Sequence, residues 1–176
     1  GAEENLLRGA YRLMQLRPQS AAVASSDQAA QTSQAGKEAP TLPPSAGPSL
    51  TLLGSGAILT EVIKAANALV EQGVAVDVIS VTSWSQLARD GQACEADETT
   101  PFLTRLLNET QGPVVAATDY VRAVPESVRA YVPEGRAYAT LGTDGFGRSD
   151  TRSALRSFFG VNAASIQAAA HRALMR

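Results

Sequence analysis

The sequence predicts an α/β protein, a three-layer sandwich around a mostly parallel five-stranded sheet. Short apolar runs such as 74–81 and 113–119 alternate with longer segments whose apolar residues recur every three or four positions. Glycines lie at the boundaries between these two kinds of segment. Strands that are joined through helices pair in parallel, and the crossover helices cover both faces of the sheet.

The first 48 residues divide into two parts. Residues 1–16 are expected to form an amphipathic helix, because apolar side chains recur there at helical spacing: Leu6, Leu7, Ala10, Leu13 and Met14. Residues 17–48 are rich in Ala, Ser, Gln and Pro and contain no aromatic residue. Such a segment buries too little apolar surface to order itself, so we expect a flexible linker; the alternative is a docking segment that folds on a partner.

The globular α/β domain is expected to span residues 49–176. Its elements are a strand from Ser49, a helix over Ala57–Gln72, a strand over Val74–Val81, a polar connection with the only tryptophan, a helix over Phe102–Asn108, a strand over Pro113–Asp119, a helix over Ala123–Tyr131, a strand over Ala137–Leu141, and helices over Arg152–Phe159 and Ala163–Leu174. Gly73 is expected to end the first of these helices, and Asn162 to cap the last.

The composition disfavours several classes of protein. A formal net charge of −2 argues against a general nucleic-acid-binding or membrane-binding surface. No run approaches the ~20 apolar residues that span a bilayer, and the first residues lack the pattern of a signal peptide. One cysteine and one histidine supply neither a disulfide framework nor a four-ligand zinc cluster. We therefore expect a soluble cytoplasmic protein. The start at Gly1 without a methionine leads us to expect either an excised fragment or a chain from which a tag was cleaved.

Two weaker motifs have ordinary interpretations. The sequence Gly54-Ser55-Gly56 lies between a strand and a helix, where a phosphate could bind, but the third glycine of a dinucleotide fingerprint is missing. Close packing of strand and helix is the favoured interpretation. Cys94 has no nearby base in the sequence, and the only histidine, His171, lies on the final helix, so neither is expected to be catalytic or to bind a metal.

The stretch Leu141–Arg156, LGTDGFGRSDTRSALR, is the strongest candidate for a functional loop. Ser149 or Asp150 is placed to cap a helix that begins near Thr151. Charged residues and glycines gather where a strand should end, which is where open α/β sheets carry their functional loops. One interpretation is an ion-pair network that fixes the loop or a subunit interface, and the other is the rim of an active site. The candidate residues are Asp119, Asp144, Phe146, Arg148, Asp150 and Arg152.

Four motifs together resemble one protein family. They are LLGSG, SVTS followed by SQLARDGQ, TDYV, and GTDGFGRSD. The chain from Leu50 to Leu174, and more faintly NLLRGAYRL before it, is similar to the C-terminal domain of the homodimeric, thiamine-diphosphate-dependent pyruvate dehydrogenase component of bacterial 2-oxo-acid dehydrogenase complexes. That domain belongs to the transketolase-like superfamily. The resemblance implies that residues 1–16 join a preceding domain.

The resemblance also implies an activity for the parent protein. Such a parent oxidatively decarboxylates pyruvate with thiamine diphosphate and magnesium, passes the acyl group to a lipoyl group, forms a homodimer and works with a dihydrolipoyl acyltransferase core. A guanidinium such as that of Arg148 or Arg152 could hold the carboxylate of a 2-oxo acid. The cofactor-binding Gly-Asp-Gly and Asn-Asn motifs of the family do not occur in this chain. The fragment is therefore expected to bind no cofactor and to be inactive alone.

The chain departs from the family at one functional position. Pyruvate-specific members often carry two histidines after a Leu-Arg pair, whereas Ser157 and Phe158 follow Leu155-Arg156 here. The alternatives are therefore a dehydrogenase for another 2-oxo acid such as 2-oxobutyrate, a transketolase, since FFGVNAASIQAAA also resembles the end of that enzyme, or a non-catalytic module that docks on the acyltransferase core.

Overall fold

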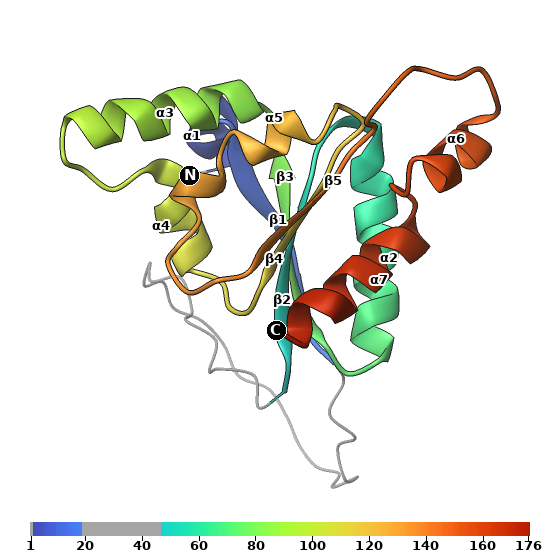
Figure 1. The fold of residues 1–176 in the computed structure, drawn as a ribbon. Helices are drawn as coiled ribbons and strands as arrows, with labels where there is room; N and C mark the ends of the chain where they lie inside the picture. The colour runs from blue at the N-terminus through green and yellow to red at the C-terminus, as the bar shows by residue number, and fades with distance from the viewer. Residues whose placement is uncertain (1, 19–46) are drawn as a thin grey trace, which may run out of the picture.

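A computed structural model describes residues 2–18 and 47–176 and confirms the three-layer α/β sandwich. The sheet has the strand order β1-β3-β2-β4-β5. All neighbouring strands pair in parallel except β1, which is antiparallel to β3. Figure 1 shows this sheet between two layers of helices. The strands are β1 (Ala10–Leu16), β2 (Ser49–Gly54), β3 (Ala75–Val81), β4 (Val114–Ala117) and β5 (Tyr138–Leu141).

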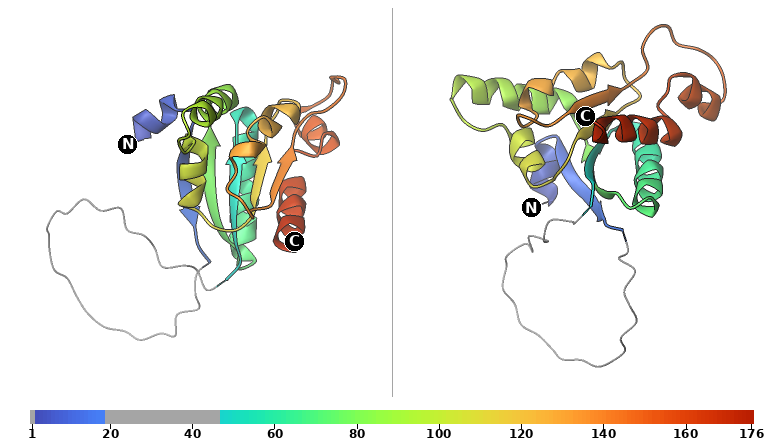
Figure 2. Two further views of the ribbon diagram at one scale, coloured as in Figure 1. Left: turned by 60° about the vertical axis from the view of Figure 1, so that its left-hand side comes forward. Right: turned by 60° about the horizontal axis from the view of Figure 1, so that its bottom comes forward.

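Helices cover both faces of the sheet (Figures 1 and 2). One face is covered by α2 (Leu59–Glu71) and α7 (Ala163–Leu174), and a 3-10 turn over Gly56–Ile58 leads into α2. The other face is covered by α3 (Trp84–Ala96), α4 (Phe102–Asn108), α5 (Ala123–Glu126) and a 3-10 turn over Arg129–Tyr131. Two further helices are α1 (Ala2–Leu7) and α6 (Arg152–Phe158), and α6 stands apart from both layers in Figure 1. Within the described ranges, no helix is both long and apolar enough to cross a membrane.

The prediction of one helix over residues 1–16 is wrong in its second half. The helix α1 ends at Leu7, and Ala10–Leu16 form the edge strand β1. Gly9, with a φ of +106°, makes the turn, and a Cβ atom there would lie 2.8 Å from the carbonyl oxygen of Ser83. Residues 10–16 pair with β3 although their apolar residues recur at helical spacing. The pairing gives hydrogen-bond partners to the backbone N–H and C=O groups along that side of the buried strand β3, and this stabilises the strand over the helix. The sheet thus takes one strand from before the predicted domain boundary at residue 49.

Other boundaries also differ from the predictions. The polar connection after β3 is the helix α3, which Ser83 caps by accepting a hydrogen bond from the backbone N–H of Gln86. The helix expected over 123–131 is split into α5 and a 3-10 turn. Helices α4 and α7 are confirmed, and Asn162 caps α7 as predicted. The predicted flexible linker lies almost wholly outside the described residues.

Alternate side chains of the parallel strands fill two separate cores. The first core lies against α2 and α7, and the second against α3 and α4. Along β3 every residue is buried, as expected for a strand that helices cover on both faces. Asp77 is the one charged residue in β3, and it forms an ion pair with Arg17 just after β1, with N···O at 3.3 Å.

A half-buried arginine joins the amino-terminal ends of three strands. The Arg136 guanidinium donates to the carbonyl oxygens of Gly112 and Leu107, each at 2.6 Å, and to the hydroxyl of Thr51 at 2.9 Å. The Thr51 hydroxyl in turn donates to that of Thr110 at 2.8 Å. Burial lowers the pKa of Arg136, but a guanidinium stays charged because its ordinary pKa is so high. This cluster aligns the starts of β2, β4 and β5.

Helix α5 covers part of the free edge of β5. Arg129 donates to the carbonyl oxygen of Tyr138 at 3.1 Å and pairs with Glu126. Glu126 also accepts a hydrogen bond from Thr140, and the Tyr138 hydroxyl donates to the carbonyl oxygen of Pro125 at 2.8 Å. Burial raises the pKa of Tyr138, so its hydroxyl stays protonated and can donate.

Glu61 on α2 connects α6 and α7 to the body of the domain. Its carboxylate accepts hydrogen bonds from Lys64 at 2.9 Å, Arg156 at 3.0 Å and the backbone N–H of Ala163 at 3.1 Å. The hydrogen bond from Lys64 is the largest cause of a lowered pKa at Glu61, and the Ala163 N–H and the charge of Arg156 add to it. The same carboxylate therefore fixes the first turn of α7 and the last turn of α6.

We predict that Arg136→Met lowers the free energy of unfolding by about 2 kcal/mol, because the Gly112 carbonyl and the buried Thr51 hydroxyl lose the guanidinium that donates to them. The measurement is urea denaturation at neutral pH. Arg105→Met is the matched control, since Arg105 is exposed and donates only to the carbonyl oxygen of Thr100. Equal losses in the two variants would contradict the bridging role of Arg136.

We predict that Glu61→Gln costs about 2 kcal/mol of stability at pH 7, and that this cost disappears in acid. The pKa of Glu61 is lowered in the folded protein from an ordinary value of 4.5. Its ionised form thus stabilises the fold above pH 4.5, and the contribution is lost as the pH falls through the lowered pKa. Denaturation curves from about pH 7 to about pH 3 check this, with the exposed Glu71→Gln as control. A difference that does not change with pH would refute it.

Candidate functional site

The carboxyl-terminal edge of the sheet is built around three side chains from separate motifs. The hydroxyls of Ser55, after β2, and Thr118, after β4, are hydrogen-bonded at 2.8 Å. The Trp84 indole N–H at the start of α3 donates to Ser55 at 3.1 Å. All three side chains are buried, so this network fixes the positions at which the loops leave the sheet. The motifs LLGSG, SVTS and TDYV are therefore neighbours in space.

The glycines of Gly54-Ser55-Gly56 serve close packing in this structure. A Cβ atom at Gly54 would lie 2.9 Å from Cγ2 of Val62 and 3.2 Å from the Cα of Leu59, so β2 could not approach α2. Gly56 has a φ of +55°, and a Cβ atom there would lie 3.0 Å from a carboxylate oxygen of Asp119. A carboxylate at this position opposes a bound phosphate, which supports the packing interpretation.

The first residues of the predicted functional loop are bound tightly to the loop that follows β4. Asp144 accepts a hydrogen bond from the backbone N–H of Arg122 at 2.8 Å and pairs with its guanidinium at 2.5 Å. The Thr143 hydroxyl donates to the carbonyl oxygen of Asp119 at 2.6 Å. The hydrogen bonds from Arg122 lower the pKa of Asp144. Residues 142–144 thus form a fixed stem, and there is no room for a side chain at Gly142.

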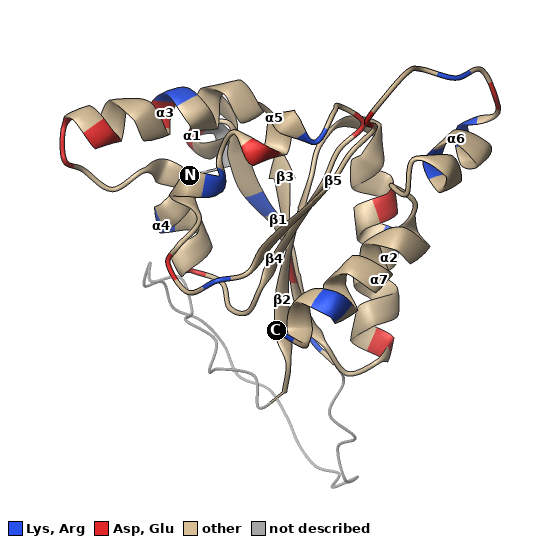
Figure 3. Cartoon of the chain, in the orientation of Figure 1, with Lys and Arg blue, Asp and Glu red and all other residues tan. Residues whose placement is uncertain are grey.

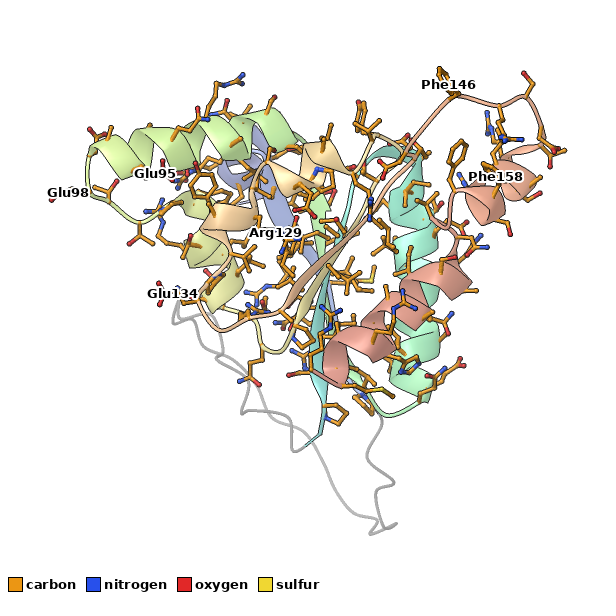
Figure 4. The ribbon with its side chains drawn as sticks, in the orientation of Figure 1. Glu95, Glu98, Arg129, Glu134, Phe146 and Phe158 are labelled. Atoms are coloured by element: carbon orange, nitrogen blue, oxygen red, sulfur yellow. The ribbon has the colours of Figure 1, made fainter. Side chains whose placement is uncertain are left out.

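Beyond the stem, residues 145–158 form an arm that makes few contacts with the body. Phe146 at its tip is 97% exposed, and Figure 4 shows its ring pointing away from the domain. A Cβ atom added at either flanking glycine, Gly145 or Gly147, would meet no atom within 4 Å beyond its chain neighbours. Helix α6, which ends the arm, has no buried residue. The arm therefore has much of its surface exposed and free for contact.

Side chains of the arm partly order one another. The Arg148 guanidinium lies over the Phe158 ring, 4.3 Å from its centre, and Phe158 packs edge-on against Phe159. The predicted caps of α6 are wrong: the cap is Thr151, whose hydroxyl accepts from the N–H of Ala154. Asp150 instead accepts from the N–H of Thr151. Thr151 has the extended backbone that a cap requires, and local sequence did not distinguish it from its two neighbours.

A pocket of about 400 Å³ lies between the arm and the body. Its polar lining comes from Arg148, Arg152, Arg156 and Asp119. Its apolar lining includes Ile58, Leu155, Phe159 and Val161. Figure 3 shows, in blue, basic residues on the loop that precedes α6 and on α6 itself. An arrangement of guanidinium groups beside an apolar wall is suited to an organic anion.

The structure brings together only part of the predicted charged cluster. Asp144 pairs with Arg122, which the sequence analysis did not single out, and Arg148 and Arg152 face the pocket with Asp119. Arg122 could have been found from the fold, because it follows β4 and Asp144 follows the adjacent strand β5. Arg156, on the last turn of α6, was also missed as a pocket residue. Ser157 and Phe158, which the sequence analysis compared with a histidine pair, are exposed on the arm.

The remaining candidate nucleophile and base lie far apart in the fold. Cys94 is on α3 and His171 is on α7, and these helices cover opposite faces of the sheet. They therefore cannot form a catalytic pair within this domain. Across residues 2–18 and 47–176, no group of three or more His, Cys, Asp and Glu side chains is arranged to hold a metal ion.

Comparison with known proteins assigns the family. Residues 40–162 match the model of the transketolase-like TK C-terminal domain. The chain is 46% identical over 123 residues to the pyruvate dehydrogenase E1 component of Mycobacterium tuberculosis, covering 65% of this chain and 13% of that protein. It is 47% identical over 128 residues to the Escherichia coli K12 component, covering 68% and 14%. The chain thus spans about one seventh of the length of these relatives.

Solved structures show the same fold. A split-gene transketolase, described as an inactive beta4 tetramer, aligns with a TM-score of 0.54 and 23% identity, covering 73% of this chain and 40% of that one. The Leishmania mexicana transketolase aligns with a TM-score of 0.50 and 22% identity, covering 72% and 16%. Together with the match over 40–162, these findings show that the chain belongs to the transketolase-like C-terminal domain family.

Proposed function

We propose that this chain is the C-terminal domain of a pyruvate dehydrogenase E1 component. The observation that carries the proposal is the identity of 46–47% to such components from Mycobacterium tuberculosis and Escherichia coli. Identity to the transketolases of similar fold is 22–23%, which favours the dehydrogenase over a transketolase parent. The parent would oxidatively decarboxylate pyruvate and pass the acyl group to a lipoyl group of a dihydrolipoyl acyltransferase core, in the bacterial cytoplasm.

The residues of this chain do not fit thiamine diphosphate or magnesium. The sequence contains neither Gly-Asp-Gly nor Asn-Asn, and the acidic side chains at the carboxyl edge do not form a metal-binding group in the part of the chain that the structure describes. The cofactors would therefore be held by the rest of the parent, and the fragment alone would be inactive.

The proposed contribution of the domain is to place the arm at the rim of an active site or at the interface of a homodimer. The stem holds the base of the arm rigidly against the sheet, while Phe146 and Phe158 are left exposed for contact with other parts of the parent. Arg148 and Arg152 add positive charge, which attracts the carboxylate of a 2-oxo acid. Asp150 is also exposed on the arm, and we propose an interface role for it.

Ser157 and Phe158 bear on the choice of substrate. Neither side chain exchanges a proton near neutral pH, whereas histidine does. If a histidine of the relatives transfers a proton at this position, then in this protein another group transfers that proton or the step does not occur. We therefore propose that these two positions influence which 2-oxo acid the parent prefers.

We expect the full-length protein that contains this chain to decarboxylate pyruvate in the presence of thiamine diphosphate and magnesium, in preference to 2-oxobutyrate and 2-oxoglutarate. The measurement is kcat/KM for each acid, with a ketose phosphate as the transketolase substrate. Preference for 2-oxobutyrate would assign altered specificity to Ser157 and Phe158. Turnover of the ketose phosphate alone would overturn the dehydrogenase assignment.

For the rim role, we expect Arg148→Ala in the full-length protein to lower kcat/KM for the 2-oxo acid roughly tenfold, which corresponds to one lost charged hydrogen bond. Within the described residues Arg148 makes no hydrogen bond or ion pair, and its contact with the exposed Phe158 ring contributes only about 0.5–1 kcal/mol, so thermal stability should change little. The matched control is Arg89→Ala, an exposed arginine on α3 far from the arm. Kinetics equal to those of the control would leave the arm with a structural role only.

A further inference from the structure

We propose that the pocket between the arm and the body is a binding site for a small organic monocarboxylate, with Arg148 and Arg152 as the groups that hold its carboxylate. The residues that line this pocket come from both the arm and the body of the domain. The inference rests on the proposed function and extends it to a ligand class, but it concerns binding and can be tested without turnover.

The polar side of the pocket has two guanidinium groups whose charge no carboxylate neutralises among the described residues, and that of Arg148 also lies over the Phe158 ring. Arg148 and Arg152 line the pocket, and neither takes part in an ion pair among the described residues. Arg156 differs from them, because Glu61 already neutralises it at 3.0 Å. Guanidinium groups bind carboxylates through paired, charge-assisted hydrogen bonds. The anion should therefore lie between Arg148 and Arg152.

The apolar side of the pocket favours an organic anion over an inorganic one. Ile58 and Val161 are 2% and 1% exposed and form a firm wall, which Leu155 and Phe159 extend from the arm side. A short hydrocarbon chain would bury its surface against this wall, at about 25 cal/mol per Å². Inorganic phosphate cannot gain this contribution.

Asp119 limits the charge that the ligand can carry. Its carboxylate also lines the pocket, so the guanidinium groups of Arg148 and Arg152 face one negative charge. A monocarboxylate can bind the guanidinium groups and keep its uncharged end near Asp119. A second carboxylate on the ligand would be repelled by Asp119 or would have to lie against the apolar wall. The pocket should therefore prefer butyrate or 2-oxobutyrate to glutarate.

A ligand in this pocket would connect the arm to the body. Arg148, Arg152 and Leu155 belong to the arm, whereas Ile58 and Asp119 belong to the body. Because α6 buries no side chain of its own, a ligand that touches both sides adds contacts that the arm lacks. Because the ligand binds only when the arm lies against the body, its binding should stabilise that arrangement.

The test is an NMR titration of the 176-residue chain with butyrate, 2-oxobutyrate, glutarate and inorganic phosphate at constant ionic strength. We expect butyrate and 2-oxobutyrate to shift the amide signals of Gly145 and Gly147 with a Kd on the order of 1 mM, as befits such small ligands. Glutarate and phosphate should bind at least roughly fivefold more weakly. Equal binding of phosphate and butyrate would overturn the assignment to a monocarboxylate.

Variants identify the groups that hold the anion. Arg148→Gln and Arg152→Gln should each weaken butyrate binding at least roughly fivefold, and Arg89→Gln on α3 should leave it unchanged. Both pocket arginines are exposed, so the variants should remain folded, which their amide spectra will show. Unchanged affinity in the double variant would refute the site. A change in kcat/KM of the parent without binding to this chain would overturn this proposal while leaving the rim role intact.

Proteolysis supplies a second readout. Chymotrypsin should cleave after Phe146, which is 97% exposed at the tip of the arm. Saturating butyrate should slow this cleavage several-fold in the unmodified chain and have no effect in the double variant. Equal slowing in both would mean that butyrate acts on the protease or elsewhere on the chain, and would contradict a ligand that joins arm and body.

Discussion

Parallel pairing of β2 with β3 and β4, and of β4 with β5, is the constraint on which the rest of the structure depends. Parallel strands need crossover connections, so helices must cover both faces, and the strands are buried on both sides. The same pairing brings the carboxyl ends of four strands to one edge of the sheet. The loops that follow these ends are thereby neighbours, although they are distant in sequence, and the candidate site forms among them.

Polar side chains fix the two edges of this sheet. Arg136 joins the starts of three strands, and Ser55, Thr118 and Trp84 join the ends of β2 and β4 to α3. Within the described ranges, no buried side-chain nitrogen or oxygen lacks a hydrogen-bond partner. Satisfied buried networks are rigid, because any displacement leaves a polar group unpaired. The stem at 142–144 inherits this rigidity through its bonds to the loop after β4.

The arm contrasts with this rigid base. It begins at the stem, and near its end Arg156 donates a hydrogen bond to Glu61 on the body. Between these two points no side chain of α6 is buried. We propose that the arm gains its stabilising contacts from other domains of the parent or from a ligand at its base. The relatives are about seven times longer than the matched region, which is consistent with an arm that other domains complete in the proposed parent.

The sequence by itself determined the fold class, most strands, the helices α4 and α7 with the Asn162 cap, and the family, because periodicity, capping and motifs are local. It also identified residues 141–156 as the candidate functional loop. Only the tertiary structure decided that 10–16 form a strand, that Asp144 pairs with Arg122, and that Arg148 and Arg152 share a pocket with Ile58. These depend on strand order and on contacts between distant segments, which local patterns do not encode.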